Sequence, residues 1–152
     1  MRLRITALMI VIMAIAFSFE PWISYTLIRD RGGIVLLNIT GIDLYNADKL
    51  GFIQHGTAGF TVFALYPLAL FAMFLAVVIG SPRLLLLSSI IALGIQLYFY
   101  ATIPPKIDAY IRAAGMTPFF NSSGVTRYFF GTVAATIAAV LLSIFELKVR
   151  NR

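Results

Sequence analysis

The stretch that decides the fold is TAGFTVFALYPLALFAMFLAVVIGSPRLLLLSSIIALGIQLYFYATI, residues 57–103. It holds two long apolar runs, 57–79 and 84–103, joined by the short turn Gly80-Ser81-Pro82-Arg83. About 20 consecutive apolar residues suffice for a helix to cross the hydrocarbon core of a bilayer. So short a connection makes the two helices antiparallel neighbours. The stretch therefore predicts two transmembrane helices, with a kink at Pro67 in the first of them.

Two further apolar runs flank this stretch, at residues 5–23 and 128–147. The first follows a basic start, as in a signal peptide, but apolar character resumes after Glu20 and Pro21, which favours a retained helix. Trp22 would then anchor the end of this helix at the membrane interface. We expect an all-α membrane protein: one domain over residues 1–152, built as a four-transmembrane-helix bundle with a small extracellular β-hairpin in the first loop.

Composition agrees with a lipid environment, because 61% of the residues are hydrophobic and only 12% are charged. Soluble domains carry about 25% charged residues. Six of the twelve Lys and Arg residues lie in three short segments, 1–4, 80–83 and 146–152. This placement favours topology signals over a phosphate-binding stripe, so nucleic acid is not an expected partner. We expect a multi-pass cell-membrane protein with cytoplasmic N- and C-termini.

The first outer loop, residues 24–56, carries a hairpin signal. Residues 24–28 and 34–39 are rich in β-branched and aromatic side chains, and the turn-forming segment 29–33 separates them. This pattern predicts two paired strands standing on the outer leaflet.

The second outer loop covers residues 104–127 and begins with Pro104-Pro105. Apolar residues then recur at helical spacing from Ile107 to Ala114, with Gly115 as a suitable cap. Two alternatives remain for this segment: a short amphipathic helix on the outer leaflet, or an extension of the third span. Residues 116–126 are expected to form a loop.

Each outer loop also contains an N-glycosylation acceptor pattern, Asn38-Ile39-Thr40 in the first and Asn121-Ser122-Ser123 in the second. Such acceptors belong on exterior loops, so their placement agrees with the proposed orientation.

Catalytic and metal-binding patterns are weak in this sequence. Without cysteines and with His55 as the single histidine, the chain has no thiolate metal site and no bis-histidine haem site. Its acidic residues Glu20 and Glu146 fall at the ends of spans rather than at their centres. We therefore expect no enzyme activity, no cofactor and no metal.

The third span carries Gln96, Tyr98 and Tyr100. These side chains could line a pocket for a quinone or a lipid headgroup. We favour another arrangement, in which the tyrosines form an interfacial aromatic belt and the deeper Gln96 bonds across helices.

Small residues recur every four positions in the last span, at Gly131, Ala135 and Ala139. Such a stripe lets helix backbones approach closely in lipid. It is expected to be an interaction face, either inside the bundle or between protomers.

Trp22 is followed nineteen positions later by Gly41-Ile42-Asp43-Leu44. With the long first loop, the tight inner turn and the short second loop, this spacing resembles the claudin family and its peripheral-myelin-protein relatives. That family carries a tryptophan soon after its first span and a Gly-Leu-Trp motif in a β-rich first loop. The resemblance implies a structural or adhesive role, with Trp22, Gly41 and Asp43 as interaction residues. The family's paired first-loop cysteines and second tryptophan are not present.

These observations favour a non-enzymatic tetraspan protein that acts as a scaffold, a cell-surface assembly unit or an accessory subunit of a membrane complex. Its expected partners are the lipid bilayer and either itself or other membrane proteins. The alternative is a small transporter or a quinone-associated subunit of a respiratory membrane enzyme.

Overall fold

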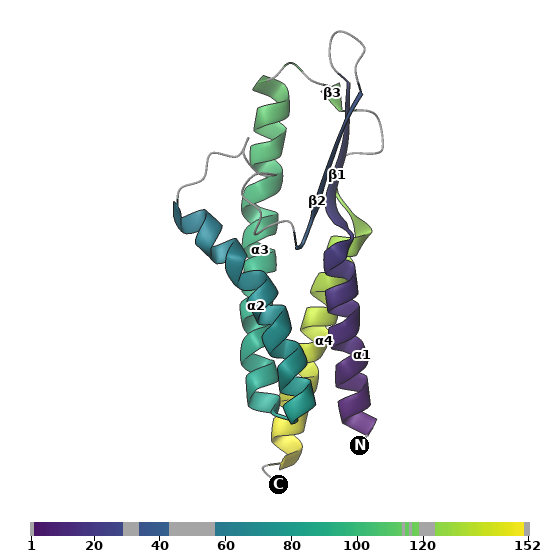
Figure 1. Ribbon diagram of the computed structural model, residues 1–152, viewed down its shortest axis with the longest axis vertical. Helices are drawn as coiled ribbons and strands as arrows, with labels where there is room; N and C mark the ends of the chain where they lie inside the picture. The colour runs from purple at the N-terminus through teal and green to yellow at the C-terminus, as the bar shows by residue number, and fades with distance from the viewer. Residues whose placement is uncertain are drawn as a thin grey trace.

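The computed structural model describes residues 2–28, 34–42, 57–113, 115, 117–118 and 124–150. Its described part is mainly helical, and Figure 1 shows the helices side by side, with a small sheet above α1 and next to the upper part of α3. Both termini lie at the opposite end. We call the end with the strands the sheet end, and the end with both termini and the turn at residues 80–83 the turn end.

Three of the described helices are long and apolar enough to cross a membrane, by length and composition. They are α2 (Thr57–Ile79), α3 (Pro82–Ala113) and α4 (Arg127–Arg150). The first helix, α1 (Arg2–Phe19), is also apolar but shorter. It packs against α4 and α2, while α3 packs against α2 and α4.

Helix α1 ends at Phe19, so the predicted first span of residues 5–23 is too long at its end. A proline disfavours the helical conformation of the residue before it. Pro21 accordingly opens strand β1 (Pro21–Ile28). Two carbonyls of the last helical turn find partners in the sheet region: Phe17 O accepts the Trp22 indole N–H at 3.1 Å, and Ser18 O accepts the Ile42 N–H at 3.1 Å.

The turn between α2 and α3 follows familiar capping rules. Gly80 has a φ of 76°, and the N–H groups of Gly80 and Ser81 both donate to Ala76 O at 2.9 Å. Ser81 Oγ then accepts the Leu84 N–H at 3.4 Å, and Pro82 occupies the first position of α3. Within α2, Pro67 removes one backbone hydrogen bond, and Figure 1 shows the helix bending along its length.

Helix α3 continues through Pro104 and Pro105 to Ala113, ten residues past the predicted end of the third span at residue 103. Of the two alternatives for the following segment, the structure shows the extension. Ile103, Ile107 and Ile111 are all buried along one side of this extension. Burial against the sheet region thus outweighs the loss of two helical hydrogen bonds at the prolines.

The two strands predicted in the first loop are paired. β1 and β2 (Ile34–Thr40) run antiparallel, with Thr26 opposite Leu36, while the predicted turn at 29–33 lies outside the described residues. The second loop adds the two-residue strands β3 (Thr117–Pro118) and β4 (Gly124–Val125), which also pair with β1. The prediction of a plain loop over residues 116–126 is therefore wrong, because both outer loops share one sheet.

Candidate interaction site

The sheet joins the helices through the side chain of Trp22, which is fully buried in β1. Its ring meets three others edge to face: Tyr66 at 5.0 Å, Phe99 at 5.3 Å and Phe129 at 5.3 Å between centroids. These rings come from α2, α3 and α4, and the indole N–H reaches α1 at Phe17. One side chain from the sheet thus contacts every described helix, and Trp22 is enclosed by the protein, whereas the predicted interfacial anchor would face its surroundings.

Gly41 lies directly against this tryptophan. A Cβ atom at position 41 would stand 2.5 Å from Trp22 Cζ2, which is closer than real Cβ contacts. Only glycine therefore fits here without a shift of the indole or of β2. The nineteen-residue spacing noted in the sequence corresponds to a direct contact between Trp22 and Gly41. Asp43, the third residue of that motif assigned an interaction role, lies outside the described residues.

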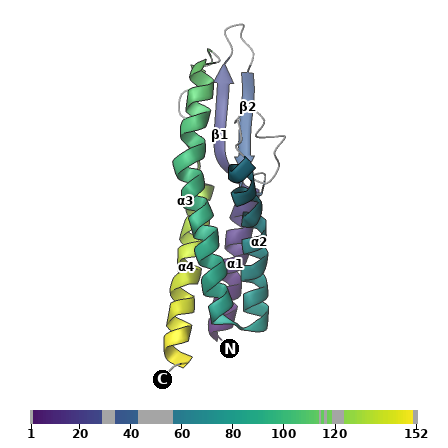
Figure 2. The same cartoon turned by 90° about the vertical axis from the view of Figure 1, so that its left-hand side faces the viewer.

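The inner face of the sheet packs on the extension of α3, as Figure 2 shows from the side. Ile23, Leu27 and Ile39 are buried on this face. Tyr25 donates its hydroxyl hydrogen to Asp108 Oδ1 on α3 at 2.7 Å. Burial, together with the neighbouring Asp108 carboxylate, raises the pKa of Tyr25 above its ordinary value. The phenol thus stays neutral and holds the sheet to α3.

The outer face of the sheet carries polar and apolar side chains, and its two most exposed apolar residues lie on β2. Ile34 and Leu36 of β2 are 71% and 69% exposed. Within the described residues β2 is the edge strand, with β1 as its neighbour. Asn38 lies on the same exposed side, where its Oδ1 accepts the Ser24 hydroxyl at 2.8 Å. Its glycosylation stays a prediction, and the second acceptor, Asn121, lies outside the described residues.

A chain of polar side chains crosses the interior of the helices. Gln96 Nε2 donates to Tyr66 Oη at 3.2 Å and to Thr136 Oγ1 at 3.0 Å. The Tyr66 hydroxyl also bonds to Ser18 Oγ at 2.8 Å. All four residues are fully buried, and they come from α1, α2, α3 and α4. The prediction that Gln96 bonds across helices is confirmed, and the network fixes the helices relative to one another.

Two buried oxygens, Gln96 Oε1 and Ser89 Oγ, have no hydrogen-bond partner among the described residues.

The three side chains considered for a quinone pocket do not converge. Tyr98 and Tyr100 are exposed on α3, whereas Gln96 points into the helices. Tyr100 instead stacks on Phe129, with centroids 5.7 Å apart and planes at 11°.

The small-residue stripe of α4, Gly131, Ala135 and Ala139, faces the inside of the molecule. A Cβ at Gly131 would stand 3.0 Å from the Phe17 ring of α1. Ala135 and Ala139, one and two turns further on, are buried. The sequence predicts this stripe either inside the bundle or between protomers. At Gly131 the structure shows a contact inside the molecule, between α4 and α1.

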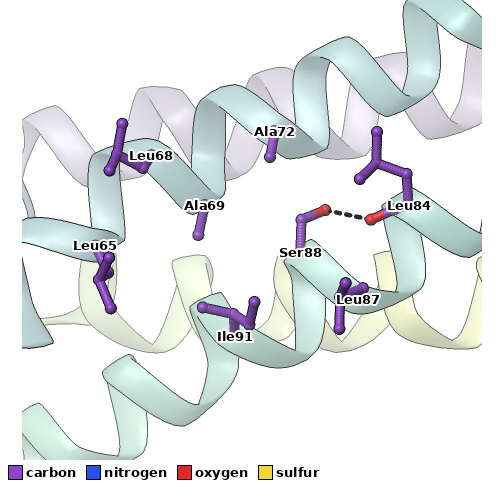
Figure 3. A pocket seen from close by; sticks show the side chains of 8 residues that line it. All are labelled: Leu65, Leu68, Ala69, Ala72, Leu84, Leu87, Ser88 and Ile91. Atoms are coloured by element: carbon purple, nitrogen blue, oxygen red, sulfur yellow. Dashed lines mark hydrogen bonds between the residues drawn. The ribbon is translucent and has the colours of Figure 1, made fainter.

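An apolar groove of about 260 Å³ lies between α2 and α3 (Figure 3). Its lining is aliphatic except for Ser88, whose hydroxyl donates to Leu84 O at 2.8 Å. The groove residues are Leu65, Leu68, Ala69, Ala72, Leu84, Leu87, Ser88 and Ile91. A surface without free polar groups can hold an acyl chain, but it offers no reactive group.

Among the described residues, no group of three His, Asp or Glu side chains could hold a metal ion. His55 lies outside them. Comparison with family models, curated proteins and solved structures finds no match for this chain. The function must therefore be argued from the geometry of the sheet and the helices.

Proposed function

We propose that this chain is a non-enzymatic integral membrane protein that crosses the bilayer four times and assembles laterally through its outer sheet. The observation that carries the proposal is the exposed apolar face of β2, with Ile34 and Leu36. Large exposed apolar side chains above the helices have no lipid to cover them. Such surfaces mark sites of protein–protein contact.

The number of spans rests on the packing of α1. This helix lies alongside α2 and α4, and its 18 residues rise about 27 Å at roughly 1.5 Å per residue. That length is close to the hydrocarbon thickness of about 30 Å. Met9 and Ile12 of α1 are exposed, as are Leu68 of α2 and Leu141 of α4. Together with exposed Leu87 of α3, these residues give each of the four helices an apolar outer surface, which supports four spans.

The orientation rests on charge. The turn end carries Arg4, Arg83, Lys148 and Arg150, and the positive-inside rule assigns such an end to the cytoplasm. The termini are then cytoplasmic, and the sheet stands outside the cell.

Lateral assembly has a geometric condition. The strands run roughly along the helices, so two copies standing the same way up in one bilayer hold their β2 strands parallel. An antiparallel ladder between the two edges would require one copy to be inverted. The contact is therefore made by side chains of the outer face, chiefly Ile34 and Leu36.

Single-cysteine crosslinking tests this proposal, because the chain contains no cysteine. Leu36→Cys should form a disulfide-linked dimer upon mild oxidation in native membranes. The matched control is Arg112→Cys, which places an exposed thiol on the α3 extension away from β2. In intact cells an impermeant maleimide should also label Leu36→Cys and spare Ser81→Cys at the turn end.

Equal crosslinking of Leu36→Cys and Arg112→Cys would indicate random collision and contradict assembly through β2. A monomeric Leu36→Cys would contradict self-assembly. Labelling of Ser81→Cys with protection of Leu36→Cys would reverse the orientation.

A further inference from the structure

Two guanidinium groups meet at one residue of the turn end, Gly80. Arg150, near the end of α4, donates from Nη2 to Gly80 O at 3.2 Å. Arg4, near the start of α1, lies over the same glycine, with its Cζ 2.6 Å from where a Cβ would stand. Gly80 therefore leaves room for Arg4 that another residue would fill. Arg83 follows three residues later, at the start of α3.

These cations border two hollows. One, of about 370 Å³, is lined by residues 79–83 together with Leu147 and Arg150. The other, of about 160 Å³, is lined by Leu3, Arg4, Glu146, Val149 and Arg150. Because Arg150 lines both, the hollows adjoin across its side chain. The turn end thus offers two adjoining hollows, one bordered by Arg4 and Arg150 and the other by Arg83 and Arg150.

The charges of this cluster are not balanced within the described part of the chain. No described carboxylate forms an ion pair with Arg4, Arg83 or Arg150, and Glu146 is the acidic residue in the lining. Like charges held close together repel, and an anion between them removes that cost. Guanidinium groups bind phosphate oxygens through paired, charge-assisted hydrogen bonds. A phosphate group is therefore the anion that fits this cluster.

The apolar lining decides between a free phosphate and a phosphate carried on a lipid. Ile79 and Val149 are largely exposed beside the cations, at 66% and 53%. A free anion gains nothing from such neighbours, whereas the glycerol and acyl portions of a phospholipid would cover them. We propose that the turn end binds one anionic phospholipid, with its phosphate held by Arg4, Arg83 and Arg150. The inference rests on the proposed membrane placement and is independent of assembly through β2.

Thermal unfolding in an uncharged detergent tests this site on the full chain. Fluorescence of Trp22 reports unfolding, because it is the chain's only tryptophan and is buried. Phosphatidylglycerol in mixed micelles should raise the Tm saturably, whereas phosphatidylcholine should not. Arg83→Gln and Arg150→Gln should each require about tenfold more phosphatidylglycerol for half of the shift, as expected for loss of one charge-assisted contact. Arg112→Gln, at the other end of α3, should behave as the wild type.

A third titration uses inorganic phosphate. An equal Tm shift at equal phosphate concentration would show a free-anion site and overturn the lipid assignment. An equal shift with phosphatidylcholine, or an equal loss of response in Arg112→Gln, would overturn the site itself. Should a glutamine variant fail to fold, Arg150→Lys keeps the charge without the paired geometry, and an unchanged phosphatidylglycerol response would then count against paired guanidinium binding. None of these outcomes alters the crosslinking of Leu36→Cys, so the two proposals fail separately.

Discussion

The two ends of the molecule are built in opposite ways. At the sheet end, polar groups are paired: the indole N–H of Trp22, in a packed aromatic cluster, bonds to Phe17 O, and the Tyr25 hydroxyl bonds to Asp108 on α3. At the turn end, cations from three helices gather around Gly80 without carboxylate partners among the described residues. Paired and buried groups stabilise a shape, while unpaired charges on an open surface remain available for a ligand. Substitutions should therefore affect stability at the sheet end and ligand response at the turn end.

The largest effect is expected from Trp22→Ala. Removal of the indole leaves a cavity among Tyr66, Phe99 and Phe129, at a cost of about 3–5 kcal/mol in the free energy of unfolding. Circular dichroism during heating in detergent measures the loss. Trp22→Phe is the matched control, since it keeps a ring but loses the hydrogen bond to Phe17 O, and it should cost clearly less. A Trp22→Ala protein as stable as the wild type would contradict the expectation that substitutions at the sheet end lower stability.

A smaller effect is expected from Tyr25→Phe, which removes the hydrogen bond to Asp108 at a cost of about 1 kcal/mol. The pKa of Tyr25 is raised in the folded state, first by burial and then by Asp108. Its contribution to stability is therefore complete below the ordinary tyrosine pKa of 10.0 and declines as the pH rises above that value. The wild type should lose its advantage over Tyr25→Phe in this range. A difference in Tm that stays constant from pH 8 to pH 11 would contradict this account.

The smallest effect is expected from Arg83→Gln in detergent without lipid. Arg83 is exposed and makes no ion pair with a described residue, so the free energy of unfolding should change by no more than about 0.5 kcal/mol. Chemical denaturation measures this directly. A loss comparable to that of Tyr25→Phe would mean that the turn end also depends on its own charges for stability.

Much of the helical framework follows from sequence. The bounds of α2 agree with the predicted residues 57–79, because hydropathy ends sharply at Gly80-Ser81-Pro82, where capping chemistry also stops and restarts a helix. The hairpin pattern gives β1 and β2 for a similar reason: segments rich in β-branched and aromatic residues flank a turn-forming segment. Both signals are local, so each of these elements can be predicted from its own segment of the sequence.

Other features depend on contacts between distant segments. Pro104-Pro105 would end a helix by local rules, but burial of Ile103 and Ile107 carries α3 past them. The short strands β3 and β4 carry no periodic pattern and exist because β1 offers them a partner. Tryptophan is typical of the membrane interface, yet three rings from α2, α3 and α4 surround the side chain of Trp22.

The proposed site at the turn end also depends on contacts between distant segments. The three arginines of this site, Arg4, Arg83 and Arg150, are distant along the chain. In the sequence each one, taken alone, indicates only the orientation of the protein in the membrane. The sequence offers one clue in Gly80, since a glycine close to a basic residue can mark a close approach as well as a helix end.

The length of helix α3 has a mechanical consequence. Its 32 residues extend about 48 Å at roughly 1.5 Å per residue, against a hydrocarbon thickness of about 30 Å. It passes unbroken from the turn end to the sheet, which is fastened to it by Tyr25 and Asp108. A transmembrane helix changes its tilt with the thickness of the surrounding bilayer. In the proposed membrane placement, a tilt of α3 by about 10° corresponds to a sideways displacement of roughly 8 Å between its two ends.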